Sequence, residues 1–350
     1  MDSVTLMARG SSVEVQVSGE AERDTVFRIA SITKPIVAAA VMLLVDDGVL
    51  RLDDPIGRWL PELAAPKVVR TPGSDVDDVV PARRPITVFD VLTSRAGWGF
   101  PADFSLPAVQ LLFAELEQYG LAPQQLPAPG EWLARLSRIP LLHQPGETWL
   151  YNICSNIQGV LVARASGMSL PEFLETRIFR PLRMKDTGFS SDRLLPAYHA
   201  NGEVLDPPDG QWSRMPAFPS GAGGLVSTAD DWLAFGRMLL DQGAGLLSPE
   251  SVRLMTTDHL TEQQRRDGAL FLDGQGWGFG GTVDVAAIDP WNVPGRYGWV
   301  GGTGTSAHIV PSTNTVAILL TQTATEDPVP PQWMRDFWLQ STIFQESASI

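Results

Sequence analysis

The sequence contains little cysteine and little histidine, which removes several kinds of metal site from consideration. Cys154 is the only cysteine in the 350 residues, so the chain can form neither an internal disulfide nor a cysteine-based metal cluster. We interpret Cys154 as a small apolar residue of the core. The four histidines, His143, His199, His259 and His308, are scattered, with no pair at the spacing of metal ligands. The sequence therefore argues against a metalloenzyme.

Long apolar runs and a basic surface are also missing. No apolar stretch is long enough to span a bilayer, and residues 1–4 lack the basic start and apolar run of a secretory signal. We therefore expect a cytoplasmic protein. The formal net charge of -14 and the isoelectric point near 4.7 argue against a nucleic acid or an anionic membrane as a partner.

A phosphate-binding motif is absent as well. The glycine-rich residues 221–224 are not followed by the Gly-Lys-Ser or Gly-Lys-Thr of a phosphate-binding loop. No cofactor is expected, and the expected partner is a small molecule. The sequence leaves open whether the protein is a monomer or a homo-oligomer.

What the chain does contain is enough apolar sequence for a large core. Hydrophobic residues make up 44% of it, which suits one two-lobed unit or two small domains. Residues 61–85 are rich in Pro, Asp and Val without a clear period, which predicts a surface connection. Strands are predicted at residues 4–8, 13–17, 276–280, 296–300, 307–310 and 316–321, and helices at residues 36–45, 86–93, 109–118, 132–138, 155–166, 171–179, 232–240 and 333–344.

The order of these elements predicts an α+β fold. Strands at both ends of the chain surround a helical middle, so we expect an antiparallel sheet built from the N- and C-terminal thirds and flanked by helices. We expect residues 1–350 to form a single unit with two lobes. Residues 1–60 and 215–350 would form the α/β sheet lobe, and residues 61–214 would form a mainly helical lobe.

The segment at residues 27–35 carries the first candidate for chemistry. Ser31 stands at the start of a predicted helix whose apolar residues recur at helical spacing, and Lys34 lies one turn along the same face. A hydroxyl at a helix N-terminus feels the positive end of the helix dipole, and a neutral amine one turn along can accept its proton. The pair has the geometry of an activated serine nucleophile, although a capped helix with a solvated lysine has the same pattern.

Lysine is scarce in this chain, which makes Lys34 informative. Lys34, Lys67 and Lys185 are the only lysines, and the other strongly basic residues are arginines. Arginine keeps its proton at working pH whereas lysine can lose it, so a lysine retained in an arginine-biased sequence suggests a role for a titratable amine. The apolar sequence from residue 36 onward also indicates that Lys34 points into a partly buried cleft.

A second polar group lies at a junction in the middle of the chain. Residues 144–153 form a turn that leads into the helix predicted at residues 155–166, and Tyr151 lies at this junction. Polar side chains at such junctions are usually presented rather than buried.

Several separated motifs together resemble one family. They lie at residues 27–35, 86–93, 145–152, 184–189, 223–230 and 301–305, and their order and spacing are similar to those of the serine β-lactamase-related hydrolases. This family comprises relatives of class C β-lactamases and D-alanyl-D-alanine carboxypeptidases and includes the family VIII carboxylesterases, which the chain resembles most. The resemblance covers nearly the whole chain and implies a β-lactamase or penicillin-binding-protein-like fold.

The resemblance implies a role for each matching residue. Ser31 matches the nucleophile, Lys34 the amine that helps to deprotonate it, and Tyr151 the tyrosine that relays protons between nucleophile and leaving group. The family's third motif falls on residues 299–301, which implies that the backbone N–H groups of Ser31 and Gly302 form an oxyanion hole. Because a tyrosine relays protons only if nearby cations lower its pKa, we expect a cationic Lys34 to lower the pKa of Tyr151.

The chain departs from the family's pattern at two positions. Where the tyrosine motif often has Asn two residues after Tyr, this chain has Ile153, with Asn152 beside the tyrosine instead. Where β-lactamases and carboxypeptidases place a cation that holds the substrate carboxylate, it has Trp299. A β-lactam or a D-alanyl peptide would lose a charge-assisted contact worth roughly 1.5 to 3 kcal/mol, whereas an uncharged ester would lose nothing.

These departures favour a serine carboxylesterase that uses a covalent acyl-enzyme on Ser31. Its predicted substrate-binding residues are Asn152, Trp299 and Gly301, and glycine at residue 301 lets the strand edge approach the substrate closely. An acyltransferase, an amidase or D-peptidase and a weak β-lactamase share the same acyl-enzyme and remain alternatives, as does a non-catalytic binding protein with the same fold.

Aromatic residues supply candidates for an acyl-binding pocket. They are Trp98, Phe100, Trp212, Trp277 and Trp299. Apart from Trp299, ordinary core packing is the alternative that we favour for each of them.

Overall fold

The hairpin at the start of the chain forms one edge of the main sheet. In the computed structural model, which describes residues 1–116, 122–325 and 327–347, β1 (Ser3–Arg9) pairs with β2 (Ser12–Ser18), as predicted. Gly10 lies in the turn between them with a φ of 55°, a conformation that glycine adopts without strain. On its other side β1 pairs antiparallel with β13 (Thr315–Thr321), from the far end of the sequence.

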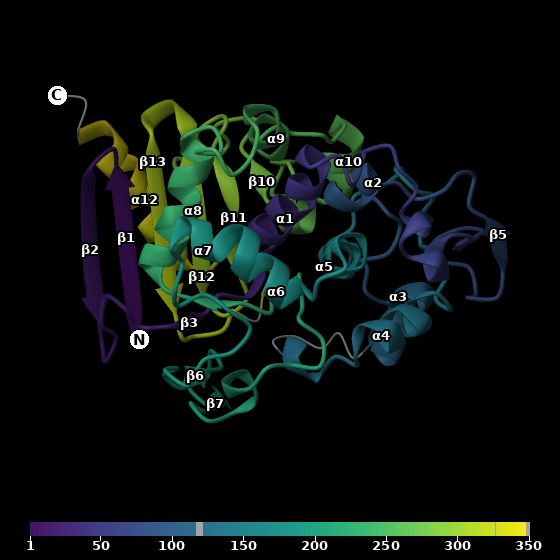
Figure 1. Ribbon diagram of the computed structural model, residues 1–350, viewed down its shortest axis with the longest axis horizontal. Helices are drawn as coiled ribbons and strands as arrows, with labels where there is room; N and C mark the ends of the chain where they lie inside the picture. The colour runs from purple at the N-terminus through teal and green to yellow at the C-terminus, as the bar shows by residue number, and fades with distance from the viewer. Residues whose placement is uncertain (117–121, 326, 348–350) are drawn as a thin grey trace.

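The sheet has seven strands in the order β2-β1-β13-β12-β11-β10-β9. In Figure 1 the purple N-terminal strands lie directly beside the yellow C-terminal strands, so the two ends of the chain meet in one antiparallel sheet, as predicted. The remaining strands of this sheet are β9 (Gly276–Trp277), β10 (Thr282–Val283), β11 (Tyr297–Gly301) and β12 (Thr305–Val310).

Helices cover both faces of the sheet. α8 (Ala229–Leu240) packs against β1, β12 and β13, and α12 (Gln332–Ser347) packs against β1 and β13. Figure 1 shows α8 in front of the sheet and α12 behind it. Thr228 caps α8 by accepting a hydrogen bond from the Asp231 N–H at 3.2 Å. None of the helices in the described part of the chain is both long and apolar enough to cross a membrane.

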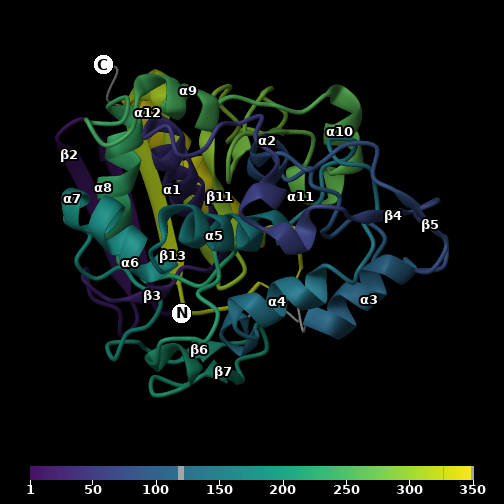
Figure 2. The same ribbon diagram turned by 45° about the vertical axis from the view of Figure 1, so that its right-hand side comes forward.

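The middle of the chain forms a mainly helical part. Figure 2 brings two of its helices, α3 and α4, forward and away from the sheet. The helices of this part are α2 (Val88–Leu92), α3 (Pro107–Leu116), α4 (Pro129–Leu136), α5 (Ile153–Ser166), α6 (Leu170–Leu174) and α7 (Arg180–Leu182). Three further helices follow α8 in the chain: α9 (Pro249–Met255), α10 (Glu262–Asp267) and α11 (Ala269–Leu272). Gly167 ends α5 in the left-handed conformation, as the sequence predicted. Residues 117 and 118 of the helix predicted at 109–118 lie outside the described residues.

Some local predictions were wrong. Residues 61–85, predicted as a plain connection, contain the hairpin of β4 (Lys67–Val69) and β5 (Val79–Pro81), because short valine runs pair on either side of the polar turn. The helix predicted at residues 171–179 divides into α6 and a π-helical turn at Glu175–Phe179. Two further small sheets pair β3 (Phe27–Arg28) with β8 (Val226–Ser227) and β6 (Ala197–Tyr198) with β7 (Val204–Asp206).

One hydrophobic cluster runs through the sheet part and the helical part. It contains Leu6 of β1, Val41 of α1 (Lys34–Asp46), Trp132 of α4 and Leu161 of α5, all of them buried. α1 packs against α5 in the middle of the molecule, and its residues from Lys34 to Leu44 are buried. This central helix brings the segment of Ser31 and Lys34 between the two parts.

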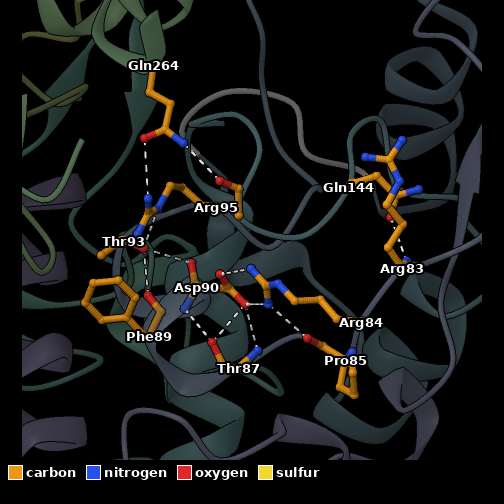
Figure 3. Close-up of polar contacts among 11 residues, drawn as sticks. Arg83, Arg84, Pro85, Thr87, Phe89, Asp90, Thr93, Arg95, Gln144 and Gln264 are labelled. Carbon is orange, nitrogen blue, oxygen red and sulfur yellow. Dashed lines mark hydrogen bonds and ion pairs between the residues drawn. The ribbon is translucent and has the colours of Figure 1, made fainter. Parts of the chain in front are cut away.

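A buried carboxylate fixes the start of α2 and lies next to a contact between the two parts. Thr87 and Asp90 form the predicted cap, because the Thr87 hydroxyl accepts from the Asp90 N–H at 3.2 Å and the Asp90 carboxylate accepts from the Thr87 N–H at 2.9 Å. The same carboxylate accepts two hydrogen bonds from Arg84, at 2.5 and 2.8 Å. Figure 3 shows this cluster with Arg95, which donates at 3.4 Å to Gln264 of α10.

Candidate active site

Ser31 lies on a strained turn that is attached to the sheet. The residue before it, Ala30, has a φ of 44°, which is unusual for a residue with a side chain, and Ala30–Thr33 form a 3-10 turn ahead of α1. The predicted helix therefore begins at Lys34 and not at Ser31. Two buried hydroxyls hold the turn: Thr303 donates to the Arg28 carbonyl at 2.5 Å, and Thr305 donates to the Ile29 carbonyl at 2.9 Å.

Lys34 reaches back over this turn to Ser31. Its Nζ lies 2.8 Å from the Ser31 Oγ and 2.5 Å from the carbonyl oxygen of Ala222. The side chain is 1% exposed, and burial lowers the pKa of Lys34 well below its usual value. A neutral amine at this distance can accept the Ser31 proton, so the structure brings together the pair that the sequence predicted.

Tyr151 faces the same pair from the helical part. It lies at the junction before α5, as predicted, and Asn152 after it has a φ of 82°, a second strained residue next to a candidate catalytic group. The Lys34 Nζ lies 4.6 Å from the centre of the Tyr151 ring. The Tyr151 hydroxyl forms hydrogen bonds with Ser31 and with the Trp299 Nε1–H, which donates at 2.8 Å.

The protonation state of Tyr151 differs from the prediction. Burial raises the pKa of Tyr151 to about 12, although the hydrogen bonds with Ser31 and Trp299 act in the opposite direction. The expectation that a cationic Lys34 would lower this pKa is wrong, because the same burial favours the neutral form of Lys34. Burial therefore favours a neutral amine at Lys34 and a protonated phenol at Tyr151, which are a base and an acid.

One glycine of the sheet, Gly301, lies against the nucleophile turn. A Cβ on Gly301 would come 2.7 Å from the Ile29 carbonyl oxygen and 3.2 Å from the Ala30 Cβ, so only glycine permits this approach. Gly302 follows at the end of β11, and its carbonyl accepts a hydrogen bond from the Thr325 N–H at 2.7 Å. Because Ser31 lies in the first turn of a helix, its N–H has no carbonyl partner within that turn. The predicted oxyanion hole of the Ser31 and Gly302 amides stays a prediction.

The remaining predicted pocket residues divide into two groups. Phe100 is half-buried beside Tyr151, with ring centres 6.4 Å apart, and Trp277 packs edge-on against Trp299, with ring centres 4.9 Å apart. Trp98 is a core residue whose Nε1–H donates to the Ile139 carbonyl. Trp212 is not at the site, since it packs with Val26, Leu194 and Val226 in a separate buried cluster.

Sequence reasoning missed the residues that hold Lys34 in place. Asn156 of α5 is 1% exposed, and its Oδ1 accepts hydrogen bonds from the Ser220 hydroxyl at 2.8 Å and the Ala222 N–H at 3.1 Å. The Ala222 carbonyl in turn accepts from Lys34. Asn156 lies five positions after Tyr151, outside the tyrosine motif, so only the position of the glycine-rich loop in the fold could reveal this contact.

Phe271 was also missed. It comes from α11 and stacks on Tyr151, with ring centres 4.8 Å apart and an interplanar angle of 28°. Ile153 is fully buried in the core, and Cys154 is a buried free thiol whose pKa burial raises to about 12. Among the described residues, no group of three or more His, Cys, Asp or Glu side chains is placed to hold a metal ion.

A cavity of about 570 Å³ adjoins the site. Tyr151, Trp299, Gly301 and Gly302 line one end of it, and Ser31 is not among its lining residues. The site is thus a buried base, a nucleophile and a phenol at the end of an aromatic cavity, an arrangement that can form and break an acyl-serine bond.

Comparison with known proteins gives relatives over most of the chain. The family described as Beta-lactamase matches residues 2–337. Protein Rv1367c of Mycobacterium tuberculosis (strain ATCC 25618 / H37Rv) is 39% identical over 327 residues, which cover 86% of this chain and 78% of the relative. Esterase EstB of Burkholderia gladioli is 32% identical over 334 residues, which cover 87% of this chain and 79% of the relative.

A solved structure also matches the fold over most of the chain. It is the structure of EstCE1, described as a hydrolase with promiscuous acyltransferase activity, and it superposes with a TM-score of 0.78 at 27% identity. The match covers 97% of this chain and 93% of EstCE1.

Proposed function

The chain belongs to the beta-lactamase family, and we propose that it is a serine carboxylesterase that works through an acyl-enzyme on Ser31. It is an enzyme of the serine β-lactamase-like hydrolase superfamily with esterase relatives. The observation that carries the proposal is the 2.8 Å hydrogen bond from Trp299 to the Tyr151 hydroxyl. It means that an uncharged aromatic side chain, and not a cation, stands beside the proton-relaying group.

Acylation uses the three side chains in sequence. Lys34 takes the Ser31 proton as Oγ attacks the ester carbonyl, and the backbone N–H groups of Ser31 and Gly302 bind the resulting oxyanion. Tyr151 gives its proton to the departing alkoxide, and the proton on Lys34 then restores the phenol. The acyl group remains on Ser31 and the alcohol leaves.

Deacylation runs the same exchange with water. Lys34 takes a proton from the water that attacks the acyl-serine carbonyl, Tyr151 gives its proton to the departing Ser31 Oγ, and the proton on Lys34 then restores the phenol. The acid is released, and both groups return to their starting states.

Trp299 favours an ester over a β-lactam. A β-lactam carries a carboxylate that an indole cannot neutralise, so burying it beside Trp299 costs the roughly 1.5 to 3 kcal/mol of a missing charge-assisted hydrogen bond. An uncharged ester has no such group. It can lie against Trp299, which lines the cavity.

The experiment is a paired assay of the wild type and the Ser31→Ala variant on p-nitrophenyl butyrate and on a chromogenic cephalosporin. We expect fast ester hydrolysis, little cephalosporin turnover, and a loss of at least about a thousandfold in Ser31→Ala. Circular dichroism of the variant checks that the fold is intact. Retained ester hydrolysis in a folded Ser31→Ala variant would overturn the mechanism, and faster cephalosporin turnover would favour a β-lactamase.

Acyl transfer is a second candidate, favoured by the likeness to EstCE1 and its promiscuous acyltransferase activity. An alcohol that competes with water for the acyl-enzyme would give a new ester in place of the acid. Adding benzyl alcohol to the butyrate assay and measuring benzyl butyrate against butyric acid separates the two outcomes.

A further inference from the structure

The cavity beside the site follows an unpaired edge of β11. β10 pairs with Tyr297 and Gly298, and within the described residues no strand pairs with that side of residues 299–301. Trp299, Val300 and Gly301 all line the cavity. An occupant therefore lies along the backbone of the strand that leads to Gly302.

The end of the cavity at the site contains the group that protonates the leaving alkoxide. Tyr151 lines the cavity and Ser31 does not. In the proposed reaction the acyl carbon bonds to Ser31, and the alcohol oxygen departs toward Tyr151. The part of the ester that extends into the cavity is therefore the alcohol part.

Part of the cavity wall is made of aromatic rings. Trp291 and Trp338 both line it, with ring centres 5.6 Å apart, and the Arg335 guanidinium lies 6.0 Å from the Trp291 ring. Ile288 and Val329 line it as well, although they are 55% and 50% exposed. A volume of about 570 Å³ lies in the range of roughly 300 to 1,000 Å³ that holds drug-sized molecules, so a simple alkyl alcohol would leave most of it empty.

The charges that line the cavity disfavour an anion. Four aspartates and two arginines line it, an excess of two carboxylates: Asp273, Asp284, Asp289, Asp327, Arg296 and Arg335. Arg296 and Asp284 are buried and pair with each other at 3.6 Å, so their charges cancel. Burial and the neighbouring Arg296 lower the pKa of His308 well below its usual value, which leaves its imidazole neutral.

We propose that this cavity binds the alcohol part of the substrate, and that this part is a bulky, uncharged ring system. The inference rests on the proposed esterase function and adds the class of ester. In the step concerned, the bond from the acyl carbon to Ser31 Oγ forms and the bond to the alkoxy oxygen breaks. The Tyr151 proton passes to that oxygen, and the ring alcohol is released from the cavity.

Three butyrate esters that share one acyl group test this. They are ethyl butyrate, naphthalen-1-ylmethyl butyrate and the naphthylmethyl ester carrying a ring carboxylate. We expect kcat/KM to be highest for the uncharged naphthylmethyl ester and to fall for the carboxylated one. Because all three form the same butyryl-enzyme, differences in kcat/KM report the alcohol part alone.

The Trp291→Leu variant removes one wall of the cavity, far from Ser31. We expect kcat/KM for the naphthylmethyl ester to fall by about tenfold while that for ethyl butyrate stays unchanged, because apolar pocket contacts discriminate by roughly 10- to 200-fold. The matched control is Trp59→Leu, which truncates a half-buried tryptophan that does not line the cavity. This variant should change neither value.

The outcomes separate this inference from the proposed function. If the wild type hydrolyses none of the three esters, the proposed function itself fails. If Trp291→Leu keeps its ethyl butyrate rate and also its naphthylmethyl rate, the cavity does not hold the alcohol part and the inference is wrong. An equal or higher rate for the carboxylated ester overturns the charge argument.

A second variant tests the charge argument without altering the cavity wall. Asp273 lines the cavity, is exposed, and has a φ of 47° that asparagine also tolerates. Asp273→Asn should raise kcat/KM for the carboxylated ester relative to the uncharged one, and the rise should shrink at high salt. No change at low salt would contradict the role given to the carboxylates.

Discussion

Burial decides the protonation states of the two groups that flank Ser31. It lowers the pKa of Lys34 well below its usual value and raises that of Tyr151 to about 12. The active form has Lys34 neutral, so kcat/KM falls as the pH drops through the lowered pKa. It also has Tyr151 protonated, so no fall is expected on the alkaline side until the pH approaches about 12.

A substitution at Asn156 should shift the pH at which kcat/KM falls on the acid side, which we call the acid limb of the pH profile. The Asn156 Oδ1 accepts a hydrogen bond from the Ala222 N–H, and the Ala222 carbonyl accepts one from Lys34. Asn156 therefore acts as a positioning residue for Lys34. Asn156→Asp keeps the acceptor oxygen and adds a buried negative charge near Lys34, which favours the ammonium form. We predict that the acid limb of kcat/KM for p-nitrophenyl butyrate shifts upward by roughly one pH unit.

The matched control is Ser220→Ala. It removes the Ser220 hydroxyl, which donates to the Asn156 Oδ1 at 2.8 Å and accepts from the Ala222 N–H at 3.3 Å, and it leaves the hydrogen bond between Asn156 and Ala222 in place. This variant should keep the wild-type profile. An acid limb of Asn156→Asp that coincides with that of the wild type would show that Asn156 does not act on Lys34.

At the residue scale, the sequence predicted which side chains form the site better than it predicted their pKa values. The motif at residues 27–35 together with the family resemblance paired Ser31 with Lys34, and the structure places Tyr151 beside both. The pKa of Tyr151 was predicted in the wrong direction, because it depends on how much water α11 and β11 exclude from the hydroxyl. No local sequence pattern carries that information.

At the scale of elements, the site depends on how the β11–β12 turn holds the nucleophile turn. Thr305 is fully buried, and its hydroxyl donates at 2.9 Å to the carbonyl of Ile29, just before strained Ala30. We predict that Thr305→Val lowers kcat for ester hydrolysis by about tenfold with little change in KM, because small displacements of a nucleophile cost large factors in rate. Thr305→Ser should restore the rate.

Thr315→Val is the control for this prediction. Thr315 is equally buried in β13, the neighbouring strand of the same sheet, and its hydroxyl accepts a hydrogen bond from the Thr313 hydroxyl and donates one to the Thr313 carbonyl. Both variants should lose about 1 kcal/mol of unfolding free energy in thermal melts, as expected for one hydrogen bond. Equal loss of kcat in both variants would mean that general destabilisation, and not the turn, is responsible.

The elements were predictable where local signals were strong. The Thr87 cap, the Gly167 stop and the alternating valines of β2 each follow from a few neighbouring residues. The hairpin of β4 and β5 was missed because its strands have three residues each and its pairing depends on the fold around it. The strained turn at Ala30 was also missed, because distant Thr303 and Thr305 hold it in place.

At the scale of the whole molecule, the catalytic groups come from two parts that must stay together. Ser31 and Trp299 belong to the part with the seven-stranded sheet, and Tyr151 belongs to the helical part. The single unit with two lobes was expected from the order of the elements, and it stays a prediction. What supports it is the hydrophobic cluster through both parts, which long-range packing creates and no sequence window reveals.

Gln264 makes a polar contact that joins the two parts near Tyr151. It is 5% exposed on α10, and its Nε2 donates to the Gly146 and Glu147 carbonyls at 2.9 and 3.1 Å, in the loop that leads to Tyr151. Figure 3 shows it above the Asp90 cluster of α2. Because this contact and the shared core tie the parts together, neither part should unfold without the other.

We therefore predict one cooperative thermal transition for the wild type, with equal calorimetric and van't Hoff enthalpies. Gln264→Ala leaves the part-buried Gly146 and Glu147 carbonyls without this donor and should lower the unfolding free energy by about 1 to 3 kcal/mol while keeping a single transition. Differential scanning calorimetry measures both quantities. Two separate transitions in the wild type would show that the parts are independent domains, and the Ser31–Tyr151 contact would then depend on their docking and not on a common core.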